Sequence, residues 1–177
     1  MGLAESFEQE KLIMGVIFHD REKYEYAMKR LTDAFGETDF ATEEFSFSEE
    51  FSTYYDGEVG GEAMRVIYSF KQLVDPSRQA EIKTFTNALE AELSIDGKRQ
   101  VNLDPGFLSH GRLMLATTKK TGFRIPLSDG IYTELTLFYA RGAWQKLPWT
   151  YRDYQSERVQ SFLTRVRKEY LNQRKGL

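Results

Sequence analysis

The segment 112–141 constrains the fold more than any other part of the chain. Apolar and polar residues alternate in three runs, 112–119, 123–127 and 131–141, and short turns separate them. A period of two is typical of β-strands. Strands joined this tightly pair antiparallel, because a parallel connection needs a crossover of about a dozen residues or more. The pattern therefore predicts a meander of three antiparallel strands.

Two strand–helix pairs precede this segment. The apolar run Leu12–His19 is typical of a strand buried on both faces, and Asp20 is a good N-cap for a helix that ends at Gly36. A strand over 65–74 leads into a second helix, whose start is marked by Asp75 and Pro76.

Three shorter segments complete the reading. "FATEEFSFSEEF" can alternate Phe45 and Phe47 as an exposed strand, and "STYYDGEVGGE" reads as a loop. Val101–Asp104 is a short strand that "DPG" stops. Apolar positions from Val159 to Tyr170 recur at helical spacing and predict a last helix.

The predicted order is β-α-β-β-α-β, then a meander, then α. This order predicts an α+β fold with a single mixed or antiparallel sheet and helices packed on a face. A split of the ferredoxin-like kind is one topology that the first half allows. A chain of 177 residues is about one domain. We therefore expect one domain over 1–177, with a frayed N-terminus over 1–10.

Several kinds of chemistry are excluded by what the sequence lacks. There is no cysteine, which excludes disulfides, thiolate metal sites and thiol catalysis. The two histidines, His19 and His110, lack metal-ligand spacing, so we expect no metal site. No P-loop, Rossmann or nucleophile-elbow motif is present. Cofactor and reaction stay unknown, and the sequence leaves open whether the protein is an enzyme.

The alternation in the strands indicates where a site can form. It places Asn102, Asp104, Arg124 and Glu134 on one surface of one sheet. Arg124 and Glu134 are roughly symmetric about the turn near Asp129, so we expect an ion pair between them. This surface is either a solvated face, with pairs worth up to ~1 kcal/mol each, or the lining of a partly covered cleft. Asp104 has a structural alternative, since a carboxylate before proline can cap a turn.

Seven pieces of the sequence resemble one family of bacterial and archaeal proteins, the domain of unknown function 4416 family. The pieces are "YYDGEVG", "SFKQLVDP", "IKTFTNALE", "RQVNLDPGFL", "LMLATTKK", "FRIPLSDGIYTELTLFY" and "LPWTYRDY". They are spread over nearly the whole chain. The resemblance implies a cytoplasmic prokaryotic protein with no assigned activity. The motif positions that it carries over include Asn87, Glu90, Lys119, Tyr132 and the four residues of the predicted polar surface.

Three classes of function follow. The first is a protein that binds a small anionic or nucleotide-like ligand through Lys119 and Arg124. Asn102, Asp104 and Glu134 would then read polar groups or hold a divalent ion, and Asn87 and Tyr132 would complete the site. The second is a protein–protein interaction module that uses the acidic segment 37–62 or the basic C-terminal helix. The third, RNA binding, is disfavoured by the net charge of −3. No window has the ~20 apolar residues of a membrane span, and the oligomeric state stays unknown.

Overall fold

One antiparallel sheet of nine strands organises residues 2–176, which are the residues that the computed structural model describes. The strand order is β2-β4-β1-β5-β6-β8-β7, with β3 paired to β4 and β9 paired to β8. The strands are β1 (Glu10–Phe18), β2 (Thr38–Ala41), β3 (Phe45–Ser46), β4 (Met64–Val74), β5 (Val101–Leu108), β6 (Arg112–Thr117), β7 (Ile125–Pro126), β8 (Tyr132–Ala140) and β9 (Ala143–Lys146).

Five α-helices and three 3₁₀ turns occur in the described residues. They are α1 (Arg21–Phe35), α2 (Phe47–Glu50), α3 (Asp56–Val59), α4 (Gln79–Glu92), α5 (Glu157–Arg174), η1 (Thr53–Tyr55), η2 (Pro76–Arg78) and η3 (Asp153–Gln155). The predicted α+β class with a single sheet is confirmed.

The first half of the chain is a split β-α-β arrangement. In the unit β1-α1-β2 the strand β4 lies between β1 and β2, and in the unit β4-α4-β5 the strand β1 lies between β4 and β5. All of these neighbours are antiparallel. This is the ferredoxin-like topology that the element order allowed.

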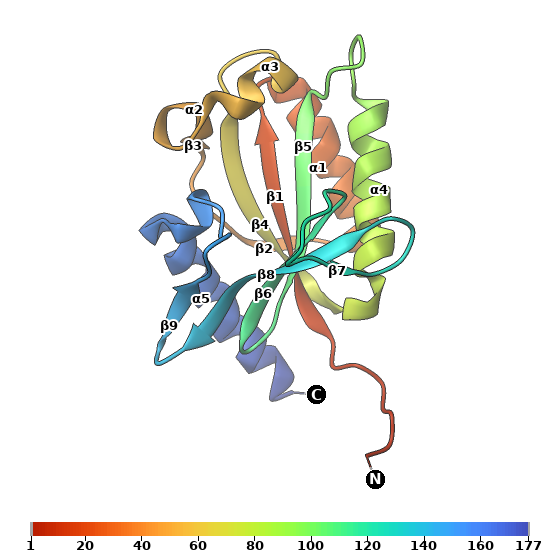
Figure 1. The fold of residues 1–177 in the computed structure, drawn as a ribbon, viewed down its shortest axis with the longest axis vertical. Helices are drawn as coiled ribbons and strands as arrows, with labels where there is room; N and C mark the ends of the chain where they lie inside the picture. Colours follow the sequence, from red (N-terminus) through yellow and green to blue (C-terminus); the bar gives the residue numbers. More distant parts are fainter. Residues whose placement is uncertain (1, 177) are drawn as a thin grey trace.

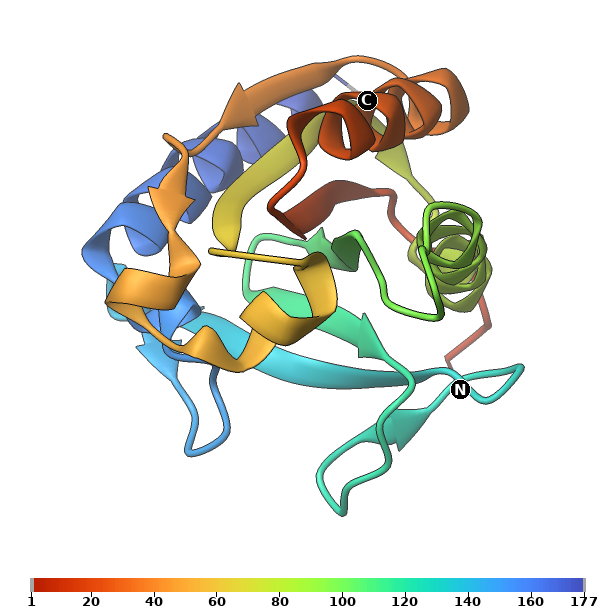
Figure 2. The same cartoon turned by 90° about the horizontal axis from the view of Figure 1, so that it is seen from above.

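Helices cover both faces of the sheet (Figure 1). On one face, α1 and α4 pack on β1, β4 and β5 around Leu12, Phe70 and Leu103. On the other face, α5 packs on Ile13 and Leu137, and α2 and α3 lie over one end of the sheet. Figure 2 shows how strongly the sheet curves around the second face. The strand β1 is buried along its whole length because it lies between these two cores.

The predicted helix starts are confirmed by their capping bonds. Asp20 accepts hydrogen bonds from the backbone N–H groups of Glu22 and Lys23 at the start of α1. The helix ends at Gly36, whose φ of 87° suits a residue without a Cβ. Asp75 caps η2, which carries Pro76 in its first turn and leads directly into α4.

The last three predicted strands are antiparallel to their neighbours, but their order differs from a meander. The strand β8 pairs with β6, and β7 pairs with the opposite edge of β8. Pro126 makes up half of β7 and has no N–H to donate, so this strand suits an edge position and not the middle of a sheet. Phe123, Ile125 and Leu127 are consequently exposed. The strand β9 follows β8 and was not predicted.

Two further expectations were wrong. Phe45 and Phe47 are buried and not exposed. The strand that contains Phe45, β3, is only two residues long, because α2 begins directly after it at Phe47. The segment expected as a loop forms η1 and α3. Side chains of η1 and α3 pack inward: the ring of Tyr55 contacts Phe47, and Val59 is buried.

The predicted stop at Pro105 was also wrong, because β5 continues through it to Leu108. Leu103, two residues earlier, points its N–H away from β1 toward Glu90. In an extended strand residues two apart direct their N–H groups to the same edge. The donor that Pro105 lacks therefore belongs to an edge that has no strand neighbour at this point.

The start of β1 lies beside the C-terminal helix α5. Residues 2–9 carry no helix or strand, and β1 begins at Glu10, which is buried. Tyr170 of α5 donates a hydrogen bond to the backbone oxygen of Gln9. Within residues 2–176, none of the helices has both the length and the apolar character that crossing a membrane requires.

Candidate functional site

A cavity of about 300 Å³ lies where β5 and β6 diverge. The ladder between them ends at the pair Gly106–Leu115. Beyond it, β5 stays paired with β1, while Ala116 and Thr117 of β6 pair only with β8. The segment 47–55 and the loop before α5 close the space from the outside. The lining residues are Ile17, Phe47, Phe51, Ser52, Tyr54, Tyr55, Arg65, Lys83, Arg99, Asn102, Asp104, Leu115, Ala116, Thr117, Thr118, Lys119, Glu134, Tyr151, Arg152, Asp153 and Tyr154.

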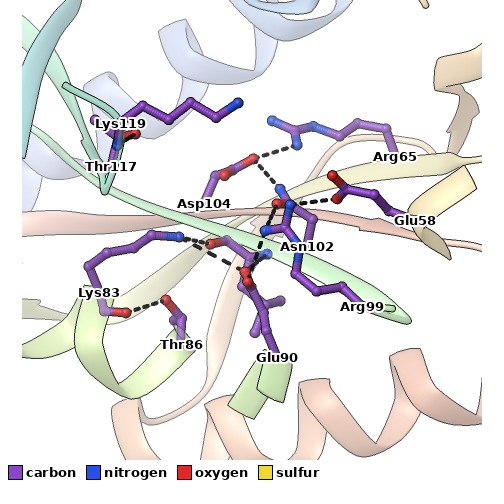
Figure 3. Close-up of polar contacts among 11 residues, drawn as sticks. Glu58, Arg65, Lys83, Thr86, Glu90, Arg99, Asn102, Asp104, Thr117 and Lys119 are labelled. Atoms are coloured by element: carbon purple, nitrogen blue, oxygen red, sulfur yellow. Dashed lines mark hydrogen bonds and ion pairs between the residues drawn. The ribbon is translucent and has the colours of Figure 1, made fainter. Parts of the chain in front are cut away.

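Side chains of α4 take the place of the missing strand beside β5 (Figure 3). Leu103 donates its N–H to Glu90 Oε1 at 2.6 Å, and Lys83 Nζ donates to the Leu103 carbonyl oxygen at 2.8 Å. Both side chains are buried, and the charges lie 3.9 Å apart. A buried backbone group without a partner is costly, so this pair stabilises the open edge. Burial raises the pKa of the Glu90 carboxyl, although Lys83 opposes this.

Arg65 of β4 is the centre of a buried ion cluster. Its Nη1 donates to Asp104 Oδ2 at 3.0 Å, and its Nη2 lies 3.2 Å from Asp153 Oδ2. Nη2 also donates to the Tyr154 hydroxyl at 3.3 Å. Gly15 leaves room for this guanidinium, since a Cβ there would lie 2.6 Å from Nη2. Burial lowers the pKa of Arg65, but Asp153, Tyr154 and Asp104 together outweigh it, so the net shift is upward and the guanidinium stays charged.

Asp104, which is partly buried, differs from Glu90, Glu134 and Asp153 in the direction in which its pKa is shifted. Burial raises its pKa. The charges of Arg65 and Lys83, with the hydrogen bonds from Arg65 and Asn102, lower the pKa by more, so the net shift is downward. The pKa of Asp153 is raised, mainly by burial. The turn-capping role considered for Asp104 is wrong, because the residue lies inside β5 and its Oδ2 accepts from Arg65 and Asn102.

Arg99 connects α3, outside the cavity, to β5, which forms one wall of it. It contacts Glu58 of α3, donates to Glu90 Oε2 at 3.1 Å and donates to Asn102 Oδ1 at 2.9 Å. Asn102 Nδ2 in turn donates to Asp104 Oδ2 at 2.9 Å. A continuous set of polar contacts therefore runs from α3 through β5 to β4 (Figure 3).

The predicted ion pair between Arg124 and Glu134 is present. Arg124 Nε donates to Glu134 Oε2 at 2.7 Å, and the side chains are 7% and 1% exposed. Arg124 directly precedes β7, and extending the register of β7 and β8 by one residue places it opposite Glu134, as the turn symmetry predicted. Arg124 is itself held by the Lys119 carbonyl oxygen and the Tyr151 hydroxyl. The face is therefore covered, and burial raises the pKa of Glu134, with Arg124 opposing the shift.

One oxygen of Glu134 is left over. Among residues 2–176, no group donates a hydrogen bond to its Oε1, although this atom is buried. Tyr151, which lies beside the pair, has its pKa raised to about 12 by burial and by Glu134. The hydroxyl therefore stays protonated at neutral pH and donates or accepts only as a neutral group.

The exposed side of the cavity is cationic and aromatic. Lys119 and Arg152 are exposed lining residues, and Lys119 Nζ lies 5.3 Å from the centre of the Tyr54 ring. In the part of the chain that the structure describes, neither cation has a carboxylate within salt-bridge distance. The other three cations of the lining, Arg65, Lys83 and Arg99, each have one.

Four of the seven residues predicted from the sequence line this cavity. They are Asn102, Asp104, Lys119 and Glu134, and Arg124 supports Glu134 from behind. Tyr132 and Asn87 are not lining residues. Asn87 lies between Lys83 and Glu90 on the same side of α4, as the spacing of i, i+4 and i+7 requires.

Several residues of the site were not predicted from the sequence, above all Arg65, Lys83, Arg99 and Asp153. They come from β4, α4, the loop before β5 and η3, and no local pattern joins them. One signal was present: Arg65 interrupts an apolar run, and a charge within a central strand is seldom buried without a partner.

The charged segments considered as docking surfaces are largely paired within the molecule. Seven of the nine acidic residues between 37 and 62 have such partners: Glu37, Asp39, Glu44, Glu50, Asp56, Glu58 and Glu62. Four arginines of α5 likewise contact acceptors on the rest of the chain: Arg158, Arg165, Arg167 and Arg174.

No cluster of three or more His, Asp or Glu side chains arranged to hold a metal ion occurs within residues 2–176. The family model described as "Domain of unknown function (DUF4416)" matches residues 8–170. No curated protein and no solved structure matches the chain.

Proposed function

This chain belongs to the family described as domain of unknown function (DUF4416), and because that description assigns no chemistry, we propose a function from the cavity itself. The protein binds a small anionic, nucleotide-like molecule between β5 and β6. The observation that carries this proposal is the difference between inner and outer cations: those inside are paired with carboxylates, and Lys119 and Arg152 at the exposed side are not.

An unpaired cation beside a cavity attracts an anion. The ammonium of Lys119 can donate three hydrogen bonds, and Arg152 can donate several in a fork that matches a phosphate or carboxylate. Hydrogen bonds to charged groups contribute about 1.5–3 kcal/mol each. These two residues are therefore the expected contacts of the anionic group.

The aromatic side chains suit a flat ring on the same ligand. Tyr54, Tyr55 and Tyr151 line the cavity together with Phe47 and Phe51. A base stacked on an aromatic side chain gains about 1–3 kcal/mol. The volume of about 300 Å³ is at the lower end of the range for small-molecule sites, which favours a mononucleotide-sized ligand over a polymer.

The pairing of the other surface charges supports the cavity over a charged docking surface. The acidic segment 37–62 and the arginines of α5 already use most of their charges within the molecule. A partner that bound there would first have to replace those contacts.

Calorimetric titration tests the proposal. The probes are inorganic phosphate and the 5′-mono- and diphosphates of adenosine, guanosine, cytidine and uridine. We expect at least one nucleotide to bind, and Lys119→Ala to weaken it about tenfold, because one charge-assisted hydrogen bond is lost.

Lys120→Ala is the matched control. Lys120 is the next residue and is also exposed, but it does not line the cavity. An equal loss in both variants would indicate non-specific attraction, and binding of none of the probes would contradict the proposal.

We also propose that the protein acts in the cytoplasm of a prokaryote. The sequence resemblance supports this. Fractionation of cells that express the protein tests the location.

A further inference from the structure

The inner part of the cavity carries more carboxylates than cations. Arg65, Glu134 and Asp153 in this part are buried, whereas Lys119 and Arg152 on the other side are exposed. The inner cluster and the residues bonded to it hold four cations, Arg65, Lys83, Arg99 and Arg124, and five carboxylates, Glu58, Glu90, Asp104, Glu134 and Asp153. The inner end is therefore rich in hydrogen-bond acceptors, and the outer end is rich in donors.

Glu134 is the residue at which this excess is sharpest. Its Oε2 is occupied by Arg124, and its Oε1 is buried with no donor among residues 2–176. Glu134 is a lining residue, so its carboxylate borders the cavity, although Oε1 itself is closed to water. An ionised carboxylate only accepts hydrogen bonds, and a buried acceptor without a donor is costly.

The position of Glu134 is fixed from behind. Arg124 holds Oε2, and the Lys119 carbonyl oxygen and the Tyr151 hydroxyl hold Arg124. A carboxylate fixed in this way presents Oε1 in one direction. Preorganised polar groups of this kind select a ligand more than they add affinity.

We propose that Glu134 determines specificity by accepting, at Oε1, a hydrogen bond from an amino group of the ligand. This inference rests on the proposed function, because the anionic group of the same molecule lies at Lys119 and Arg152. The ligand is therefore dipolar, with a phosphate or carboxylate at the exposed end and an N–H donor at the buried end. Both an amino-substituted nucleotide and a phosphorylated or carboxylated aliphatic amine have this chemistry.

Matched probes distinguish the two sources. Adenosine 5′-monophosphate is compared with purine riboside 5′-monophosphate, which lacks only the amino group, and phosphoethanolamine is compared with ethyl phosphate. In the wild-type protein we expect the amino member of one pair to bind roughly tenfold to hundredfold more tightly, since its partner leaves Oε1 without a donor. The pair that discriminates identifies the source.

Glu134→Gln tests the residue itself. Arg124 Nε can only donate, so the amide oxygen of Gln must face it, and the amide NH₂ must face the cavity. The substitution therefore replaces an acceptor by a donor with almost no change in shape. We expect the preference for the amino member to fall to about unity or to reverse, while binding of inorganic phosphate is unchanged.

Glu44→Gln is the matched control, because Glu44 pairs with Arg21 and does not line the cavity. Circular dichroism checks the folding of both variants, and the wild-type comparison decides the question if Glu134→Gln does not fold. Probes that bind without discrimination overturn this inference and leave the proposed function standing. If no probe binds, both are overturned. Retained preference in Glu134→Gln also overturns the assignment to Glu134.

Discussion

Glu134 and Arg124 show what a single residue's position can reveal and what it cannot. Their pairing follows from the turn between them, because antiparallel strands oppose residues that are symmetric about the turn. Their burial does not follow, since Tyr151 and the cover over the cavity come from distant segments. On an open face this ion pair would contribute under about 1 kcal/mol to stability. In a buried position the removal of one partner is much more costly, because the other charge stays buried without a partner.

Removing Arg124 should therefore be costly. In Arg124→Met the carboxylate of Glu134 stays buried without its partner, and we expect the free energy of unfolding at pH 7 to fall by about 3–5 kcal/mol. Urea denaturation measures this. Lys29→Met is the control, because its pair with Asp33 is exposed and its loss should cost under about 1 kcal/mol.

The loss in Arg124→Met should depend on pH. Burial already raises the pKa of Glu134, and Arg124 is what opposes that shift. Without Arg124 the folded-state pKa rises further, so the folded variant binds more protons than its unfolded chain at pH values above 4.5, and its stability falls as pH rises through this window. The variant should accordingly recover toward pH 4.5. A loss that is equal at pH 5 and pH 7 would contradict the assignment to Glu134.

At the scale of elements, the predicted helices and long strands followed from local patterns, and the edges of the sheet did not. Asp20 and Asp75 mark helix starts because a cap is a local interaction. Pro105 was read as the end of a strand because proline breaks a ladder. It lies inside β5 because the neighbouring strand diverges there, which is a tertiary fact that no window of the sequence contains.

Lys83 and Glu90 of α4, which bond the backbone of Leu103, should be needed to stabilise the unpaired edge of β5. Lys83→Met leaves the carbonyl of Leu103 without its donor and Glu90 without one of its two cations, with Arg99 remaining. We expect a loss of about 1–3 kcal/mol in the free energy of unfolding, again by urea denaturation. The exposed Lys29→Met serves as the control here too. A loss no larger than that of the control would mean that the backbone of β5 does not depend on α4.

At the scale of the molecule, α5 joins the two halves of the chain. Phe162 belongs to a core that also holds Ile13 of β1 and Leu137 of β8. The apolar spacing of α5 predicted the helix, but not which strands it covers, because those strands are up to about 150 residues away in the sequence. The same holds for the cavity, whose walls come from eight separate segments. The single domain over 1–177 stays a prediction.

Phe162→Ala tests that prediction. We expect the free energy of unfolding to fall by about 3–5 kcal/mol. The unfolding transition should stay cooperative, because both halves of the chain contribute to the core around Phe162. Trp144 and Trp149 report on the second half by fluorescence, and far-ultraviolet circular dichroism reports on all elements. The two curves should coincide. Separate midpoints would show that the halves unfold independently.

The divergence of β5 from β6 has a consequence for how such a protein can change its function. The hollow exists because β5 and β6 diverge beyond Gly106 and because α4 satisfies the edge of β5 that is left unpaired. At Gly106 itself the two main chains are so close that a Cβ would lie 2.4 Å from the Met114 carbonyl oxygen. Lys119, Tyr54 and Arg152 line the hollow but take part in neither of these two features. On the proposed function, exchange of these three residues alters which ligand is recognised, while the cavity itself is retained with the backbone.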